Sequence, residues 1–277
     1  WESMEPVPVP GEGPGADGLD PRYERCLQAY HAMSTQSPLL KAMHDMPPEH
    51  VHEEIELLEM DFASYNLEWL AVVPRWRDHY LGLDLTSSYG YLKKSLQVLQ
   101  HFRPRQRWVL KCPQHLEQLA PLRKAFPDAV LAFTHRDPVS VIQSAITMTA
   151  YGDRMRRSRV DLPAVAAYWI DRIERLLRAC VRDRHMAPAE QSIDVLFHEF
   201  MADDLAMVAR IYSLAGLDLP DSARADLDAF HARLSAVVKC TSRISIRSRH
   251  RNWSVSYTHL RAHETDSYLV CRLVLEK

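Results

Sequence analysis

The segment AVLAFTHRDPVSVIQS, residues 129–144, decides the fold class. It begins with a short, uninterrupted apolar run, which is typical of a strand buried on both faces. The dipeptide Asp137-Pro138 follows, and proline at the first helical position is typical of a helix start. The chain therefore passes from a strand into a helix within a few residues, with Arg136 at the junction. This order predicts one strand–helix unit of a parallel α/β sheet.

Two more apolar runs extend this pattern along the chain. They cover residues 107–112 and 193–198, and a helical pattern follows each of them. Strands that alternate with helices form a parallel sheet, and ligands of such sheets bind at the carboxyl ends of the strands. We therefore expect one edge of the sheet to carry Lys111, Arg136 and His198, which stand at or just after the ends of the three predicted strands.

Four segments differ in composition. Residues 1–20 interleave prolines with glycines, which predicts an extended loop. Residues 21–103 are predicted to form a helical region that lies over or beside the strand ends, in front of an α/β core at residues 104–236. Residues 237–277 are expected to be irregular. Their last part, 254–277, resembles an adapter-derived end of metagenomic reading frames, so we expect it not to be native.

Apolar residues at helical spacing predict four helices in the helical region, at 21–46, 49–65, 67–80 and 89–102. Pro74 is expected to kink or split the third, and Ser87-Ser88 is expected to cap the fourth. The second helix carries Glu53, Glu54, Glu56 and Glu59. We expect these carboxylates to form a solvated helix face. The alternative is that one of them acts as a base in a functional site.

Composition and charge exclude several classes of function. A chain of 277 residues with 47% hydrophobic residues can bury a sizeable core. The formal net charge of −2 gives no reason to expect a nucleic-acid partner or an anionic membrane. The five scattered cysteines have no metal-ligand spacing, so we expect no metal and reduced thiols in a cytoplasmic protein. We also expect no signal peptide and no membrane-spanning segment, because neither pattern occurs in these 277 residues.

The junction segment carries an anion-binding pattern. Arg136 offers a planar fork of donors that suits phosphate. Ser144 stands eight residues later, about two helical turns, so its hydroxyl can face the same side. Backbone N–H groups at the helix start also favour an anion. The alternative is that Arg136 pairs with a carboxylate such as Asp137 and that Ser144 is simply a small helix residue.

A second pattern places a cation and a base near the end of the first strand. Lys111 is followed four residues later by His115. Transfer of a charged group to a hydroxyl needs a base to accept the hydroxyl proton and a cation to stabilise the leaving oxygen. The alternative is that His115 forms a hydrogen bond to a loop from the start of a helix.

Three blocks resemble one family in order and spacing: LKCPQHL at 110–116, FPDAVLAFTHRDPVSVIQS at 126–144 and VLFHEFMADD…IYSLAGL at 195–217. The chain is similar here to the bacterial branch of the sulfotransferases that use 3′-phosphoadenosine 5′-phosphosulfate (PAPS). The resemblance covers residues 1–219. It implies a three-layer parallel sheet of the P-loop NTPase-like type with a helical insert. It also implies an enzyme that transfers a sulfuryl group from PAPS, without a metal, to a hydroxyl or amine of a small-molecule or glycan acceptor.

The resemblance also implies a role for each candidate residue. Arg136 and Ser144 would bind the 3′-phosphate of PAPS, and His198 would lie near the adenine, where relatives often have tyrosine. Lys111 would sit beside the sulfuryl group, with His115 as the candidate base. Many relatives place a histidine two residues after that lysine, whereas His115 stands four residues after it.

The chain departs from the family pattern at its start. The first strand and the phosphosulfate loop of the form P-R-S-G-T-T are not recognisable, so we expect an N-terminally truncated fragment that is inactive alone. One alternative function is a nucleotide-dependent kinase of a related fold, although no GxxxxGK[ST] sequence is present. Another is a non-catalytic module, either a helical interaction protein or a binder of adenosine bisphosphate.

Overall fold

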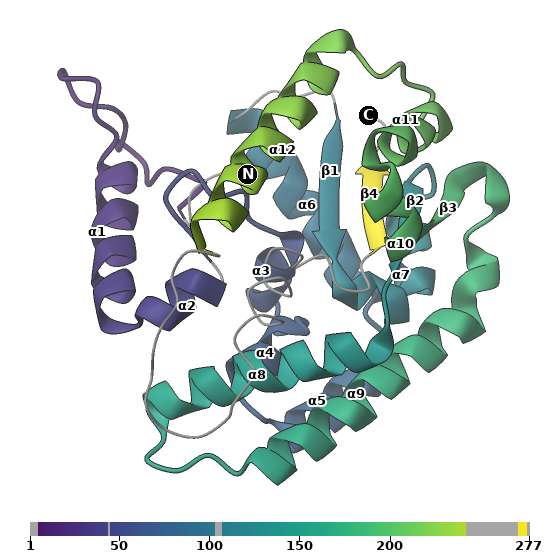
Figure 1. Cartoon of the computed structure of the whole chain (residues 1–277), viewed down its shortest axis with the longest axis horizontal. Coiled ribbons are helices and arrows are strands. Elements are labelled where there is room, and N and C mark those ends of the chain that lie inside the picture. Colours follow the sequence, from purple (N-terminus) through teal and green to yellow (C-terminus); the bar gives the residue numbers. More distant parts are fainter. Residues whose placement is uncertain (1–4, 44, 103–106, 242–270, 276–277) are drawn as a thin grey trace.

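The sheet contains four strands in the order β1-β4-β2-β3 (Figure 1). This arrangement comes from a computed structural model that describes residues 5–43, 45–102, 107–241 and 271–275. The strands are β1 (Trp108–Cys112), β2 (Val130–His135), β3 (Ser192–Leu196) and β4 (Cys271–Leu275). β2 pairs with β3 in parallel, and β4 pairs antiparallel with both β1 and β2. β1, β2 and β3 therefore run in the same direction and end at one edge.

Helices make up most of the described chain. Before the sheet lie α1 (Pro21–Gln36), α2 (Pro38–Met43), α3 (Glu54–Glu59), α4 (Asn66–Leu70), α5 (Pro74–Leu81) and α6 (Thr86–Phe102). After β1 come the 3₁₀ helix η1 (Pro113–Glu117), α7 (Leu119–Ala125), α8 (Pro138–Arg156), α9 (Leu162–Asp183), η2 (Arg184–Met186) and η3 (Ala189–Gln191). The chain continues through α10 (Phe197–Ala202), α11 (Asp204–Leu214) and α12 (Asp221–Thr241). The α/β class predicted from the sequence is confirmed.

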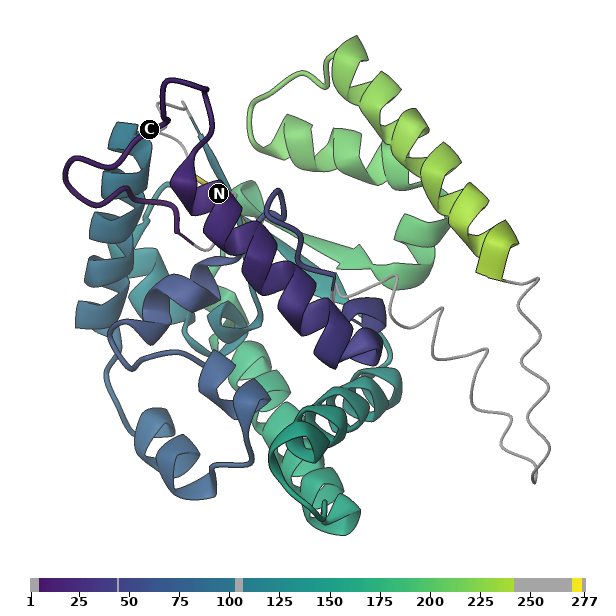
Figure 2. The same ribbon diagram turned by 90° about the vertical axis from the view of Figure 1, so that its left-hand side faces the viewer.

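Side chains of β2 pack on both faces of the sheet. Leu131 and Phe133 belong to the main core, together with buried residues of α3, α6, α7 and α9. Val130 and Ala132 point to the other face and pack near α11. Figure 2 shows α6 on one side of the sheet and α11 with α12 on the other. The apolar run of β2 follows from this double burial, because a strand covered on both faces has no polar side.

Acidic caps and prolines place the helix starts. Asp137 accepts hydrogen bonds from the backbone N–H groups of Val139 and Ser140, and Pro138 begins α8. Pro74 splits the helix predicted at 67–80, because it can only begin α5 and cannot lie inside it. The predicted cap at Ser87-Ser88 is wrong: α6 begins at Thr86, whose N–H donates to Asp84.

The structure differs from the sequence prediction in the tail. α12 continues to Thr241, and residues 271–275 form β4, where an irregular segment is expected from 237 onward. β1 and β2 each need a partner for the backbone groups on their facing edges, and the run Cys-Arg-Leu-Val-Leu has strand propensity. β1, β2 and β3 share one direction, as the sequence predicts, and β4 adds an antiparallel strand between β1 and β2. Residues 242–270 of the predicted tail lie outside the described residues.

The second predicted helix, 49–65, is helical only at α3. It ends where Phe62 takes a positive φ of 52° and Ala63 N–H donates to the Leu58 carbonyl. Such a left-handed residue after a helix is usually glycine, because a Cβ is strained there. The Phe62 side chain is 75% exposed, so its burial offsets little of that strain.

Phe62→Gly is therefore expected to raise the free energy of unfolding by about 0.5–1 kcal/mol. Relief of left-handed strain contributes about 1–2 kcal/mol, and the greater freedom of glycine in the unfolded chain removes about 0.5–1 kcal/mol. Urea unfolding measures the change. Met60→Gly is the matched control, because Met60 is equally exposed but has an ordinary φ of −64°. That variant should be destabilised. A loss of stability in Phe62→Gly would contradict the strain at this position.

Candidate active site

Three candidate residues lie at the carboxyl edge of the sheet. Lys111 is the penultimate residue of β1, Arg136 follows β2 directly, and His198 lies in the first turn of α10 after β3. Because the three strands run in the same direction, their ends meet at one edge, as the sequence predicts. In Figure 1 β1 runs down toward α3 at this edge. The roles of these residues stay predictions.

Arg136 is half-buried beside the start of α8. Its guanidinium carbon lies 4.9 Å from the centre of the Phe197 ring, within the range of a cation–π contact. Both carboxylate oxygens of Asp137 are engaged by the start of α8, and the hydrogen bonds from Ser140 hold the Asp137 pKa below its ordinary value. Asp137 therefore acts as the helix cap. Ser144 lies half-buried in the second turn of α8.

His115 is fully buried, and both of its ring nitrogens have partners. Nε2 lies 2.8 Å from Glu54 Oε1, and Nδ1 lies 2.8 Å from the Tyr89 hydroxyl. An ionised carboxylate can only accept, so Nε2–H donates to Glu54, and the Tyr89 hydroxyl is the hydrogen-bond partner of Nδ1. Both ring nitrogens are therefore engaged by buried partners. To act as a base, His115 must first break one of these two bonds.

Glu54 joins η1 to β1. Its second oxygen accepts the backbone N–H of Lys111 at 3.0 Å, while its first accepts from His115. The carboxylate is 1% exposed, so the predicted solvated face is wrong for Glu54. The physical reason is that α3 is short and its first turn abuts the end of β1. The sequence did carry a signal: Glu54 stands four residues before Leu58, on the apolar side of the helix.

Glu53 pairs with the side chain of Lys111. An ion pair joins Glu53 Oε1 to Lys111 Nζ, and each side chain is about a quarter exposed. Burial raises the pKa of Glu53 above its ordinary value, and the charge of Lys111 opposes part of that rise. Two consecutive carboxylates thus bind Lys111, one at its backbone and one at its ammonium group. The predicted solvated face is wrong for Glu53 as well.

A buried charge network lies behind this edge. Arg172 of α9 is fully buried and donates to Glu68 at 2.8 Å and to Glu117 at 2.6 and 2.7 Å. The Tyr168 hydroxyl donates to Glu68, and the Tyr80 hydroxyl donates to Glu117. Glu117 belongs to η1, so the network fixes the segment that carries His115 against α9. Sequence reasoning missed it, although Arg172 lies on the apolar stripe of α9.

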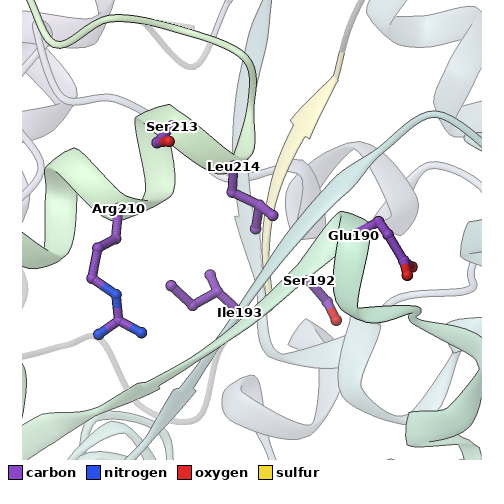
Figure 3. Close-up of a pocket in the computed structure, with 6 residues that line it drawn as sticks. All are labelled: Glu190, Ser192, Ile193, Arg210, Ser213 and Leu214. Atoms are coloured by element: carbon purple, nitrogen blue, oxygen red, sulfur yellow. The ribbon is translucent and has the colours of Figure 1, made fainter.

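A shallow cleft lies elsewhere on the molecule. It has a volume of about 550 Å³ between the beginning of β3 and α11, and it is lined by Glu190, Ser192, Ile193, Arg210, Ser213 and Leu214 (Figure 3). It is at the opposite end of β3 from His198. None of the candidate residues lines it.

Among the described residues, no group of three His, Cys, Asp or Glu side chains has a geometry that could hold a metal ion. Within the same residues, no helix is long and apolar enough to cross a membrane.

Comparisons with known proteins give one family. The model described as "Sulfotransferase family" matches residues 2–221. The crystal structure of sulfotransferase STF1 from Mycobacterium tuberculosis is 29% identical, with a TM-score of 0.63 over 74% of this chain and 56% of that one. Sulfotransferase STF9 from Mycobacterium avium is 23% identical, with a TM-score of 0.70 over 83% and 60%. The chain thus spans little more than half the length of these structures. No curated protein matches it.

Proposed function

Since the chain belongs to the sulfotransferase family, we propose that it transfers a sulfuryl group from PAPS to a hydroxyl or amine of a small-molecule or glycan acceptor. The observation that carries this proposal is the arrangement of Lys111 and Arg136, two cations at the ends of β1 and β2, which run in the same direction on either side of β4 and end at one edge. PAPS presents anionic groups at both ends of its nucleoside, and two separated cations suit such a ligand.

We assign the roles of the candidate residues by this fit. Arg136, with Ser144 on α8, binds the 3′-phosphate, and His198 on α10 lies on the side of the adenine. Lys111 stabilises the negative charge that builds on the bridging oxygen as the sulfuryl group leaves. His115 holds η1 in place through its two buried hydrogen bonds. The kinase and the non-catalytic module gain no support from the fold or from the family match.

The sheet supports a further part of the proposal. Both faces of β2 are covered, as in the three-layer arrangement that the family resemblance implies. Among the described residues, no glycine-rich loop connects a strand to a helix at the carboxyl edge. The phosphosulfate loop predicted from the resemblance is therefore not assigned to any described residue.

Arg136→Ala tests the proposed donor site. Titration calorimetry with PAPS is expected to show saturable binding by the full chain and a dissociation constant about 30-fold higher in the variant. The reason is the loss of about 2 kcal/mol from charge-assisted hydrogen bonds to phosphate. Arg178→Ala is the control, because Arg178 is exposed on α9 and, within the part of the chain that the structure describes, forms its ion pair with Glu174 of the same helix. Equal binding by both variants, or no binding by the folded chain, would overturn the proposed donor site.

A further inference from the structure

We propose that Glu53 holds Lys111 until the donor binds and then accepts the proton of the acceptor once Lys111 has moved to the donor. This inference rests on the proposed function and assigns the base that the reaction needs. It replaces His115 in that role with a carboxylate from the helical region.

The geometry favours Glu53 because it is the accessible partner of Lys111. The two carboxylates that bind Lys111 differ in exposure: Glu54 is 1% exposed, whereas about a quarter of the Glu53 side chain reaches solvent. Glu54 has both oxygens committed, to His115 and to the Lys111 backbone. A base must lie within hydrogen-bond reach of the acceptor, and only an accessible group beside the transferred sulfuryl meets that condition.

The charges around Glu53 make it more basic when Lys111 leaves. Lys111 and Cys112 face it from β1, and Glu54 and Glu56 face it from α3. Burial and the two neighbouring carboxylates raise the pKa of Glu53, while Lys111 lowers it. Movement of the Lys111 ammonium group toward an anionic donor removes that opposing charge. Donor binding therefore raises the pKa of Glu53, and at a pH above that raised value the carboxylate stays ionised and is the stronger base.

The transfer step forms one bond and breaks one bond. The acceptor oxygen forms a bond to the sulfur of PAPS, and the bond from sulfur to the bridging oxygen breaks. The electron pair of that bond stays on the phosphate oxygen, where Lys111 stabilises the charge. The proton of the acceptor hydroxyl goes to a Glu53 oxygen and then to water. No metal, oxidant or further reactant enters the step.

Proton uptake on PAPS binding tests this inference without needing turnover. Calorimetric titrations of the full chain in two buffers of different ionisation enthalpy give the number of protons taken up per PAPS bound. If Lys111 leaves Glu53, the Glu53 pKa is higher in the PAPS-bound chain than in the free chain. At a pH between these two values, the wild-type chain should take up a substantial fraction of one proton. Glu53→Gln should lose that fraction while still binding PAPS. The 3′-phosphate also titrates near neutral pH and contributes to the proton uptake of both chains. The difference in uptake between the wild-type chain and Glu53→Gln therefore reports on Glu53 alone.

Glu59→Gln is the matched control, since Glu59 is a carboxylate of α3 that accepts from Asn66 and does not pair with Lys111. It should keep the uptake of the wild-type chain. A second measurement needs no donor: in Lys111→Met, a carbon NMR titration should show a higher Glu53 pKa than in the wild-type chain. Equal uptake in Glu53→Gln and wild type, or an unchanged Glu53 pKa in Lys111→Met, would overturn the inference alone. Absence of PAPS binding by the folded wild-type chain would overturn the proposed function and this inference with it.

Discussion

Arg172→Met is expected to lower the free energy of unfolding by about 3–5 kcal/mol, a large share of the stability of a typical domain. The methionine keeps much of the volume but removes the only guanidinium that bonds both Glu68 and Glu117 among the described residues. Two carboxylates then remain buried without a counter-charge, which is the costly outcome of breaking a buried ion pair. Urea unfolding followed by circular dichroism measures the loss.

Neutral amides separate charge from packing in this network. The triple variant Arg172→Met, Glu68→Gln, Glu117→Gln keeps the volumes and leaves no unpaired charge, so it should recover at least half of the loss. A triple variant as unstable as Arg172→Met alone would assign the loss to packing.

Acid should reduce the deficit of Arg172→Met. Burial already raises the pKa of Glu68 in the folded chain, although Arg172 opposes the rise. Without Arg172 that pKa rises further, so the folded variant binds protons more tightly than its unfolded form. Its stability therefore falls as pH rises through this window, and the deficit shrinks as pH falls below the raised pKa. A deficit that does not change with pH would contradict this account.

Glu54→Ala is expected to cost about 3 kcal/mol of stability. The substitution leaves the His115 Nε2–H and the Lys111 N–H without their acceptor in a region that excludes water. It also removes the side chain that connects η1 to the end of β1. Thermal unfolding measures the loss, and PAPS binding should weaken in the folded fraction because Lys111 loses its fixed backbone position.

Glu54→Gln is the matched variant, and its loss should stay near about 1 kcal/mol. The amide oxygen can accept the Lys111 N–H, and the amide nitrogen can donate to His115 Nε2. His115 must then carry its proton on Nδ1 and donate to Tyr89. Nitrogen NMR should therefore show the Nε2–H form in the wild-type chain and the Nδ1–H form in the variant. The same tautomer in both chains would contradict the hydrogen-bond directions assigned here.

Local patterns predicted much of this fold. Apolar runs predicted β1, β2 and β3 within about two residues, and the Asp137-Pro138 pair predicted the start of α8. Gly216 follows α11 with a positive φ of 66°, a conformation that favours glycine. The common direction of the three strands predicted which edge carries Lys111, Arg136 and His198. These features depend on side-chain spacing and backbone preferences over a few residues, so a single sequence contains them.

The prediction of a helix at 49–65 failed because it used only local sequence patterns. Its apolar spacing continues through Phe62, but the backbone turns there and α3 has only six residues. The first turn of this short helix meets the end of β1, which buries Glu54 although glutamate is ordinarily exposed. Packing against a strand more than fifty residues later decided this, and no local pattern contains that contact.

The sequence by itself determined the strand ends, the start of α8 and the cations at the carboxyl edge, because each depends on neighbours along the chain. Only the tertiary structure decided which ion pairs and hydrogen bonds the charged side chains form. Glu54 meets His115 across 61 positions, and Arg172 meets Glu68 across 104. The burial of a charged side chain depends on which distant groups pack around it and whether they supply a partner. The ion pair of Lys111 and Glu53 was therefore identified only in the tertiary structure, although the sequence contains both residues.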